Sequence, residues 1–597
     1  DRDGDWDELF RSSNKKNALK EFVLDNVTFV NNVRLVLDQP KNTSIHAAGV
    51  VIVPKQDREG NPMTIFDWMP LTKRDGVLIS EWEGTYLEKC GFMKNDILGT
   101  RQLDKFRYIT NLIKETTGED VDIYNIPVRN EDYVYSLFAE GNTEDTFHFG
   151  SPGLKSYCKQ VKPIAIEDLI DTISLHRPAL MDIGAHKDFV NIRHGRTKAH
   201  YDFMLEDITK GTNGIIVYQE QVMEAARDIG GFTMQEADDV RRAMGKKKIE
   251  VIKPYKDQFV KGAVERGCPP LEADQLWNKL ELFSGYGFNR SHATAYAMTG
   301  YVGMWFKAYY PLQFWTAAFK YAKDEDIPKF LSEMHRTGKV KVSPPDINTS
   351  GDEFTTDYSA NTIHWSLSKI KQVGDVATDD VMADRDKSGK YFSVEEFFKR
   401  VTRKKVNKKV ITSMIFAGCM DKMCGITNIT DRIKIFREYA KLIDETTSTM
   451  LDLDKVKLKY WWAAKQKVVS GLGSFDLAEI AKESGFSSKL KLIDAPDVQD
   501  NDSLGYKCSI AGMIIDLNTH KGGKGEFANI LIDSNDEQVW VTCWTDVWEG
   551  IKKDVLGDPE KPEVKLIVIS GKIEADSFKG VNVIATTNTS KASVINT

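Results

Sequence analysis

The chain has no long hydrophobic run, and no apolar stretch approaches the roughly 18 residues that a membrane-spanning helix requires. Its first ten residues are mainly acidic and do not resemble a basic and apolar leader. These absences predict a cytoplasmic protein without a membrane partner.

Cysteines are few and do not occur at the spacings typical of disulfide or zinc sites. The seven cysteines are an odd number and form no CxxC pair, which argues against a disulfide framework and against a zinc site. Cys419 and Cys424 are the nearest pair, and we interpret them as two buried thiols rather than metal ligands.

An excess of positive charge is absent too. With 81 basic and 88 acidic residues the net charge is −7, so the whole molecule has no bulk attraction to nucleic acid. Any binding of nucleic acid must come from local basic patches. The length of 597 residues predicts about four domains, and no internal repeat indicates a solenoid.

A lone lysine and a lone carboxylate, Lys94 and Asp96, lie two residues apart in an otherwise apolar segment. If the segment is a strand, its period of two places both side chains on one face. The β-branched run from Ser44 to Val53 predicts a second strand of the same sheet. A metal and a phosphate would suit such a face, and a solvated surface charge pair is the alternative.

The densest basic cluster follows a predicted helix. Thr233 and Glu236 form a capping box that opens the helix, and Gly245 ends it. Arginines at consecutive helix positions diverge by about 100°, and planar guanidinium groups suit phosphate oxygens. A solvated face that complements the helix dipole is the alternative. The cluster consists of Arg241, Arg242, Lys246, Lys247 and Lys248.

Residues 283–292 combine two glycines, three aromatic residues and polar side chains at the predicted start of a long helix that ends at Pro311. Free helix amides, glycines and cations together can cradle a phosphate, although the GxxxxGK[ST] order of a Walker loop is absent. His292 could equally be a capping histidine. The candidate ligands are Tyr286, Arg290, Ser291 and His292.

Two further stretches are typical of nucleic-acid binding. One lies between two predicted pairs of helices joined by glycine turns, where a helix-hairpin-helix unit would meet a DNA backbone; it contains Arg403, Lys404, Lys405 and Lys408. Five period-two segments between Tyr506 and Val583 predict a small barrel, with Lys521 and Lys524 in its first loop. Solvated faces, and core packing for Trp540 and Trp544, are the alternatives.

Several of these segments, in this order, resemble the C-family replicative DNA polymerases, the family of the bacterial DNA polymerase III α subunit. Residues 46–52 resemble the family's HAGGVVI strand, and residues 94–99 resemble its KFDFLG. The likeness continues through the segments YQEQVM, RRAMGKKK, GYGFNKSHS and PPDIN, which correspond to residues 218–223, 241–248, 285–292 and 344–348.

The resemblance implies roles for individual residues. Asp96 would be a palm aspartate that binds the two catalytic magnesium ions, and Lys94 would contact the incoming dNTP. The fingers side of the nucleotide pocket would comprise Arg241, Arg242, Tyr286, Arg290, Ser291 and His292. The implied reaction is attack by a primer 3′ oxygen on the α-phosphate of a dNTP, directed by primer-template DNA.

The chain also departs from the family. The other two palm aspartates belong to a PDFDxDF strand about a hundred residues upstream, and neither this strand nor the phosphoesterase-like PHP domain is found here. The segments 147–151 and 174–180 differ from FQLES and ALFRPGP, and residues 448–453 are a poor substitute for a clamp-binding QxxLF. We therefore expect a second chain carrying the PHP domain and the PDFDxDF strand, and a sliding clamp is a further expected partner.

The expected fold is α+β and multidomain: a partial palm sheet, large helical fingers, a helix-hairpin-helix region and an OB-fold barrel. The expected function is that of part of a split, viral form of a DNA polymerase, located in the cytoplasm of its host. The alternatives are a non-catalytic DNA-binding relic and a ligase or repair scaffold. The expected domains are the thumb end (1–45), half of the palm (46–103), the fingers (104–345), the helix-hairpin-helix region (346–425), a connector (426–500) and the OB-fold (501–597).

Overall fold

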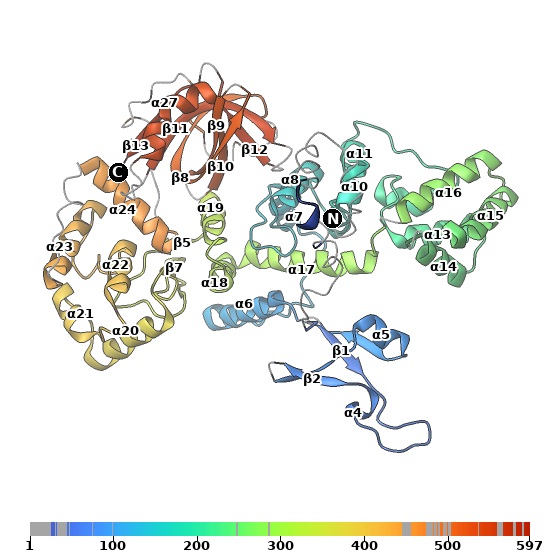
Figure 1. Ribbon diagram of the computed structural model, residues 1–597, viewed down its shortest axis with the longest axis horizontal. Helices are drawn as coiled ribbons and strands as arrows, with labels where there is room; N and C mark the ends of the chain where they lie inside the picture. Colours follow the sequence, from blue (N-terminus) through green and yellow to red (C-terminus); the bar gives the residue numbers. More distant parts are fainter. Residues whose placement is uncertain are drawn as a thin grey trace. The chain divides into compact units, whose positions relative to one another are not determined.

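The structure is a computed structural model of one chain (Figure 1). It describes residues 25–29, 32, 45–46, 48–443 (except 75, 98, 246–248 and 285–286), 455–472, 482, 486, 490–493, 498 and 503–596 (except 524, 535–536, 558–564, 577–580 and 588–589). The chain divides into a first unit, Asp1–Arg101, and a second unit, Gln102–Thr597.

The first unit contains two small sheets. Strand β1 pairs antiparallel with β4, with Gly49 opposite Asp96 and Val51 opposite Lys94. The prediction that these two segments pair in one sheet is confirmed. The elements are β1 (Gly49–Ile52), α4 (Ile65–Trp68), the antiparallel pair β2 (Leu71–Arg74) and β3 (Val77–Ser80), α5 (Gly84–Lys89) and β4 (Met93–Asp96).

The second unit begins with a long helical part. Its elements are α6 (Arg101–Thr117), α7 (Asp132–Ala139), α8 (Pro152–Val161), α9 (Ile166–Leu175), α10 (Pro178–Asp182), α11 (Ala185–Arg193), α12 (Glu206–Thr209), α13 (Gln219–Asp228), α14 (Met234–Gly245), α15 (Ile249–Glu265), α16 (Pro270–Ser284), α17 (Arg290–Tyr309), α18 (Pro311–Tyr321) and α19 (Ile327–Thr337). Among the described helices, none combines the length and apolar character that crossing a bilayer requires.

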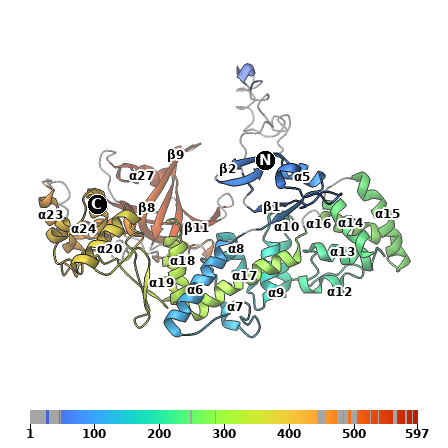
Figure 2. The same cartoon turned by 90° about the horizontal axis from the view of Figure 1, so that it is seen from below.

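Helix α17 is the longest helix of this part and packs against α7, α9 and α18 (Figure 2). A small residue also lets α17 approach the segment between α7 and α8: a Cβ added to Gly300 would lie 2.7 Å from the Phe149 ring and 2.8 Å from the Phe147 carbonyl oxygen. Pro311 starts α18 directly after α17 ends. The predicted long helix and its end are confirmed.

A buried ion pair joins α17 to α19. Lys307 Nζ lies 2.6 Å from a Glu333 oxygen, and both side chains are at most 5% exposed. Lys307 also donates to the carbonyl oxygens of Asn142 and Glu144, and the other Glu333 oxygen accepts the Glu144 amide. Burial lowers the pKa of Lys307, against the opposing effect of Glu333. Each charge is therefore buried with several hydrogen-bond partners.

The next part combines a three-stranded sheet, in the order β5-β7-β6, with helices that share one core. Its elements are β5 (Lys341–Ser343), β6 (Thr355–Asp357), β7 (Thr362–His364), α20 (Asp375–Ser388), α21 (Val394–Arg400), α22 (Lys408–Ala417), α23 (Arg432–Leu442) and α24 (Lys455–Ser470). Residues of α23 and α24, from the expected connector, pack in this core.

One expected helix of this part is absent. The segment before α20 was expected to be helical, but Leu367–Val373 forms successive turns with i to i+3 bonds. Gln372 has φ +74°, which interrupts a right-handed helix. Helix α22, which belongs to the second predicted pair of helices, is present and ends at Gly418, whose φ is +85°.

The C-terminal part is a β-sheet with one described helix. Its strands are β8 (Lys507–Gly522), β9 (Gly525–Ser534), β10 (Glu537–Cys543), β11 (Lys565–Asp576), β12 (Val581–Ala585) and β13 (Ala592–Asn596), and α27 (Thr545–Leu556) follows β10. The strand order is β12-β10-β9-β8-β11-β13, and β12 also pairs with β11. The five strands predicted from the alternation are present, and β13 was not predicted.

The buried pair gives a prediction about stability. The Glu333→Ala variant should lose about 3–5 kcal/mol of unfolding free energy, because Lys307 would keep its burial and lose its counter-ion. The matched control is Glu395→Ala, whose partner Lys399 is 69% exposed; it should lose less than about 1 kcal/mol. Denaturant unfolding of both variants measures this difference, and equal losses would contradict it.

Candidate functional site

In the first unit, the predicted pair lies on one face of the β1–β4 sheet. Lys94 Nζ is 3.3 Å from an Asp96 carboxylate oxygen, so the prediction that both side chains share a strand face is confirmed. His46 Nδ1 lies 3.9 Å from the same Asp96 oxygen and accepts the Gly49 amide at 2.8 Å. This face presents a cation, a carboxylate and an imidazole within a few ångströms.

Gly49 makes this grouping possible. A Cβ at position 49 would lie 3.0 Å from Lys94 Cε and 3.0 Å from His46 Nδ1. Because Gly49 has no side chain, the aliphatic part of Lys94 can cross the strand there. The Lys94 side chain is only 25% exposed. The Asp96 side chain is 54% exposed and therefore open to a ligand from solvent.

The described residues provide few metal ligands here. No group of three or more His, Cys, Asp or Glu side chains able to hold a metal occurs among them. One exposed carboxylate fits a magnesium ion, which keeps several waters and takes few protein ligands. It does not suffice for two ions, which need further carboxylates.

In the second unit, hydrogen bonds join the loop before α17 to the start of α13. The Phe288 amide donates to the Val217 carbonyl oxygen at 3.0 Å, and the Gln219 amide donates to the Phe288 carbonyl oxygen at 3.0 Å. We call these two bonds the 217–288 backbone pair. They fix the N-terminus of α17 beside the first residues of α13.

Side chains cap the first amides of α17. Asn289 accepts the His292 amide at 2.8 Å and the Ser291 hydroxyl at 2.6 Å. Glu220 accepts the Arg290 amide at 3.0 Å and the Asn289 side-chain amide at 2.9 Å. The expectation of free amides at this helix start is therefore wrong for Arg290 and His292, because two neighbouring side chains are acceptors within reach.

The two arginines of α14 converge on one carboxylate. Arg241 donates to Asp238 Oδ1 at 2.7 Å, and Arg242 lies 2.7 Å from Asp238 Oδ2. Arg241 also donates to Gln219 at 3.2 Å, which links α14 to α13. Both long side chains reach back to a residue three or four positions earlier, but their surroundings diverge as expected, because Arg241 is only 27% exposed and contacts α13. Arg242 remains 63% exposed.

Arg290 lies near a buried polar pair. Its guanidinium is 5.4 Å from the Tyr218 ring centre, and the Tyr218 hydroxyl donates to Asp171. Burial raises the pKa of Asp171 to about 7, although the Tyr218 hydrogen bond opposes the shift. Tyr218 and Asp171 are residues that the sequence analysis did not single out, since only the folded chain brings α9 and α13 together.

A cluster of rings surrounds His292. Its ring is 4.2 Å from Tyr296, and the His148 ring is 4.5 Å from Tyr296. The Arg177 guanidinium lies 3.5 Å from the Phe288 ring centre. Burial and the charge of Arg177 lower the pKa of His148. His148 and Arg177 come from the two segments that depart from the family pattern, and that departure was the only signal for them.

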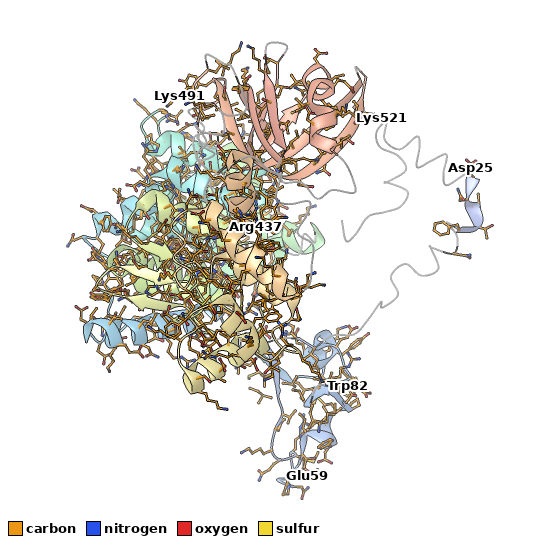
Figure 3. The ribbon with its side chains drawn as sticks, turned by 90° about the vertical axis from the view of Figure 1, so that its left-hand side faces the viewer. Asp25, Glu59, Trp82, Arg437, Lys491 and Lys521 are labelled. Atoms are coloured by element: carbon orange, nitrogen blue, oxygen red, sulfur yellow. The ribbon has the colours of Figure 1, made fainter. Side chains whose placement is uncertain are left out.

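The remaining predicted residues have different surroundings. Arg403 lies over the Phe398 ring and Lys405 pairs with Asp380 at 3.1 Å, whereas Lys404 and Lys408 are exposed. Lys521 is exposed at the end of the β8–β9 hairpin (Figure 3). Predicted residues that lie outside the described part of the chain are Tyr286, Lys246, Lys247, Lys248 and Lys524.

An aromatic row lies along the same hairpin. His520 is opposite Phe527 in the β8–β9 pairing, and their rings stack at 5.2 Å. The Phe527 ring is 5.0 Å from Trp544, which is 49% exposed. Trp544 is thus not a core residue.

Three protein-family models match the chain. Residues 4–99 match the bacterial DNA polymerase III alpha NTPase domain, and residues 102–267 match the bacterial DNA polymerase III alpha subunit finger domain. Residues 339–428 match the helix-hairpin-helix motif.

Curated relatives agree with these matches. The DNA polymerase III subunit alpha of Neisseria meningitidis serogroup B is 33% identical over 563 residues, which are 91% of this chain and 47% of the relative. The proteins of the same name from Borreliella burgdorferi and Aquifex aeolicus are 36% and 35% identical, over 68% and 64% of this chain and 35% and 32% of their own length. The chain thus spans about half, or less, of the length of these relatives. It belongs to the DNA polymerase III alpha-subunit family, the C family of replicative polymerases, and corresponds to the carboxy-terminal portion.

Proposed function

We propose that this chain is part of a template-directed DNA polymerase and supplies its nucleotide-binding side and one metal-binding aspartate. The observation that carries the proposal is the Lys94–Asp96 pair, which lies over Gly49 in a segment that matches the alpha-subunit NTPase domain. The relatives that match most of this chain are named as alpha subunits of a DNA polymerase.

Asp96 would hold magnesium ions together with carboxylates from another segment. Bound there, two such ions stabilise the attacking and leaving oxygens in the displacement at the α-phosphate. Lys94, fixed 3.3 Å from Asp96, would neutralise phosphate charge at the same face. The 54% exposure of Asp96 leaves room for both ligands.

The cations of α14 and α17 would hold the triphosphate. Arg241 is positioned by Asp238 and Gln219, and Arg290 is exposed at the start of α17. Because Glu220 and Asn289 already accept the amides of Arg290 and His292, the phosphates would be bound by side chains rather than by the helix amides. Arg242, Tyr286, Ser291 and His292 complete the proposed pocket.

Another polypeptide segment would complete the palm. On the second face of the β1–β4 sheet four apolar side chains are 48–64% exposed: Val50, Ile52, Met93 and Ile97. Two-stranded sheets are marginal in water, and strands that pair or cover them add the missing stability. We propose that the segment carries the PHP domain and the PDFDxDF strand, and that the polymerase is active only with it.

The parts of the chain would serve as thumb end (1–45), half palm (46–103), fingers (104–345), helix-hairpin-helix and clamp-binding region (346–425), connector (426–500) and OB-fold (501–597). The division after Arg101 and the finger-domain match from residue 102 support the boundary between palm and fingers.

The C-terminal sheet would be an OB-fold barrel that binds single strands. Its pairings run from β12 through β10, β9, β8 and β11 back to β12, which is a closed ring of five strands. The His520, Phe527 and Trp544 rings give bases a stacking surface, and Lys521 and Lys524 add charge for the backbone. Lys246, Lys247, Lys248, Arg403, Lys404, Lys405 and Lys408 would contact the duplex backbone.

A non-catalytic DNA-binding relic is the rival function. The single carboxylate at the β1–β4 face favours it, since the described residues form no metal cluster. Activity in the presence of the missing aspartates separates the two functions.

Primer extension tests the proposed function. The chain, mixed with a polypeptide that carries the other palm aspartates, should extend a primer in the presence of magnesium. Asp96→Ala should reduce the rate by at least about a thousandfold, because a metal ligand is lost. The control Asp239→Ala changes a partly exposed carboxylate of α14 and should keep the wild-type rate. Extension that survives Asp96→Ala would refute the catalytic assignment, and no extension by any mixture would favour the relic.

Single-strand affinity tests the barrel. Trp544→Ala should weaken binding of an oligothymidine by about 1–3 kcal/mol, because a base loses its stacking partner. Lys521→Ala should reduce the dependence of affinity on salt, since fewer counterions are released. Lys553→Ala, on the nearby helix α27, serves as the matched charge control. Fluorescence anisotropy at several salt concentrations measures both effects, and wild-type affinity for Trp544→Ala would rule out the stacking surface.

A further inference from the structure

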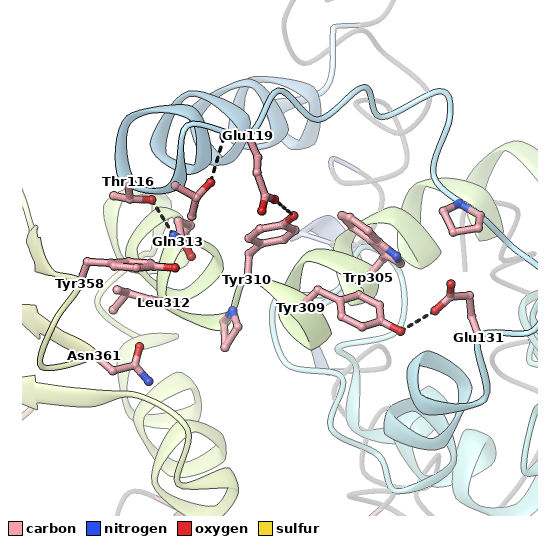
Figure 4. A pocket seen from close by; sticks show the side chains of 13 residues that line it. Thr116, Glu119, Glu131, Trp305, Tyr309, Tyr310, Leu312, Gln313, Tyr358 and Asn361 are labelled. Atoms are coloured by element: carbon pink, nitrogen blue, oxygen red, sulfur yellow. Dashed lines mark hydrogen bonds between the residues drawn. The ribbon is translucent and has the colours of Figure 1, made fainter.

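A separate pocket lies where α6, α17, α18 and the β6–β7 turn meet (Figure 4). Its volume is about 950 Å³, and none of its residues belongs to the proposed nucleotide or DNA sites. Polar and aromatic side chains line most of it; the main ones are Glu119, Glu131, Trp305, Tyr309, Tyr310 and Tyr358.

Aromatic rings form much of the wall. The Trp305 ring centre is 5.2 Å from Tyr309 and 5.6 Å from Tyr310, at angles of 53° and 49°. Tyr309 and Tyr358 are 46% and 56% exposed. Rings this exposed are not explained by core packing, and their faces are open to a ligand. Aromatic faces attract cations through the ring quadrupole.

The charged groups of the lining are both acidic. Glu119 accepts the Tyr310 hydroxyl at 2.5 Å, and Glu131 accepts the Tyr309 hydroxyl at 2.6 Å (Figure 4). These contacts orient the carboxylates, and Glu131 raises the pKa of Tyr309 by its hydrogen bond. Burial and Glu119 raise the pKa of Tyr310 to about 12, so its hydroxyl stays a donor. None of the lining residues is Lys, Arg or His, so a phosphate would be repelled.

The same surface already holds one cation on a tyrosine. Lys339 Nζ lies 4.5 Å from the Tyr133 ring centre, and Tyr133 contacts Tyr309 edge to face at 6.1 Å. Burial lowers the pKa of Lys339. This contact lies next to the pocket and leaves the Glu119 and Glu131 carboxylates without a basic partner in the lining.

We propose that this pocket binds the arginine or lysine side chain of a basic protein segment. The cationic group would lie on the Trp305, Tyr309 and Tyr310 rings and pair with Glu119 and Glu131. A guanidinium fits best, because it is planar, stacks on rings and forms two parallel bonds with a carboxylate.

Fluorine NMR of the chain labelled with 5-fluorotryptophan tests the proposal locally, and Trp305→Phe identifies the Trp305 signal. An acetylated and amidated Ala-Arg-Ala-Arg-Ala peptide should shift this signal saturably. The Glu119→Gln and Glu131→Gln double variant keeps the size and polarity of both side chains and should bind at least about tenfold more weakly. Glu272→Gln, an exposed carboxylate of α16, is the charge-matched control and should bind as the wild type does.

Three results would overturn the proposal. One is the absence of a saturable shift with the peptide. Another is a shift that the double variant retains in full, which indicates binding without the carboxylates. The third is a shift with spermidine and none with the peptide, which assigns the pocket to a free polyamine. The readout needs no polymerase activity, so its result is independent of the proposed function.

Discussion

The 217–288 backbone pair is the constraint on which the candidate nucleotide pocket depends. Its two backbone hydrogen bonds hold the N-terminus of α17 against the first turn of α13. Because of them Glu220 can reach the Arg290 amide, and in the same turn of α13 Gln219 accepts a bond from Arg241 of α14. Without these bonds the N-terminus of α17 would not be held beside α13, which lies far from it in the sequence.

The sequence predicted features that depend on neighbouring residues. The capping box of Thr233 and Glu236 is local, and so is the period of two that puts Lys94 and Asp96 on one face. Helix α17 follows from its apolar pattern and from Pro311. In each case the interacting groups are at most a few positions apart, so the local order of residues is sufficient to predict the feature.

Features that depend on distant residues were missed or misjudged. The bond of Arg241 to Gln219 joins residues 22 positions apart, on α14 and α13. The contact of His148 with Tyr296 joins residues about 150 positions apart, and the Tyr218–Asp171 bond joins α13 to α9. The acceptors at the start of α17 were missed for the same reason, since Glu220 is 70 positions from Arg290.

The two sites proposed in the second unit have opposite chemistry. In one, Arg241 of α14 and Arg290 of α17 would bind a phosphate; in the other, aromatic rings and carboxylates would bind a cation. This separation of charge is consistent with a net charge of −7, because binding of a polyanion then depends on where the cations are placed and not on how many there are.

The most direct test of the account is the affinity of the chain for a dNTP. Equilibrium titration with dATP and magnesium should give a dissociation constant at least about tenfold higher for Arg290→Ala than for the wild type, since a charge-assisted contact is worth about 1.5–3 kcal/mol. Arg227→Ala, which removes an exposed arginine paired with Asp228, should leave it unchanged. Equal affinity of Arg290→Ala and the wild type would contradict the proposed nucleotide pocket.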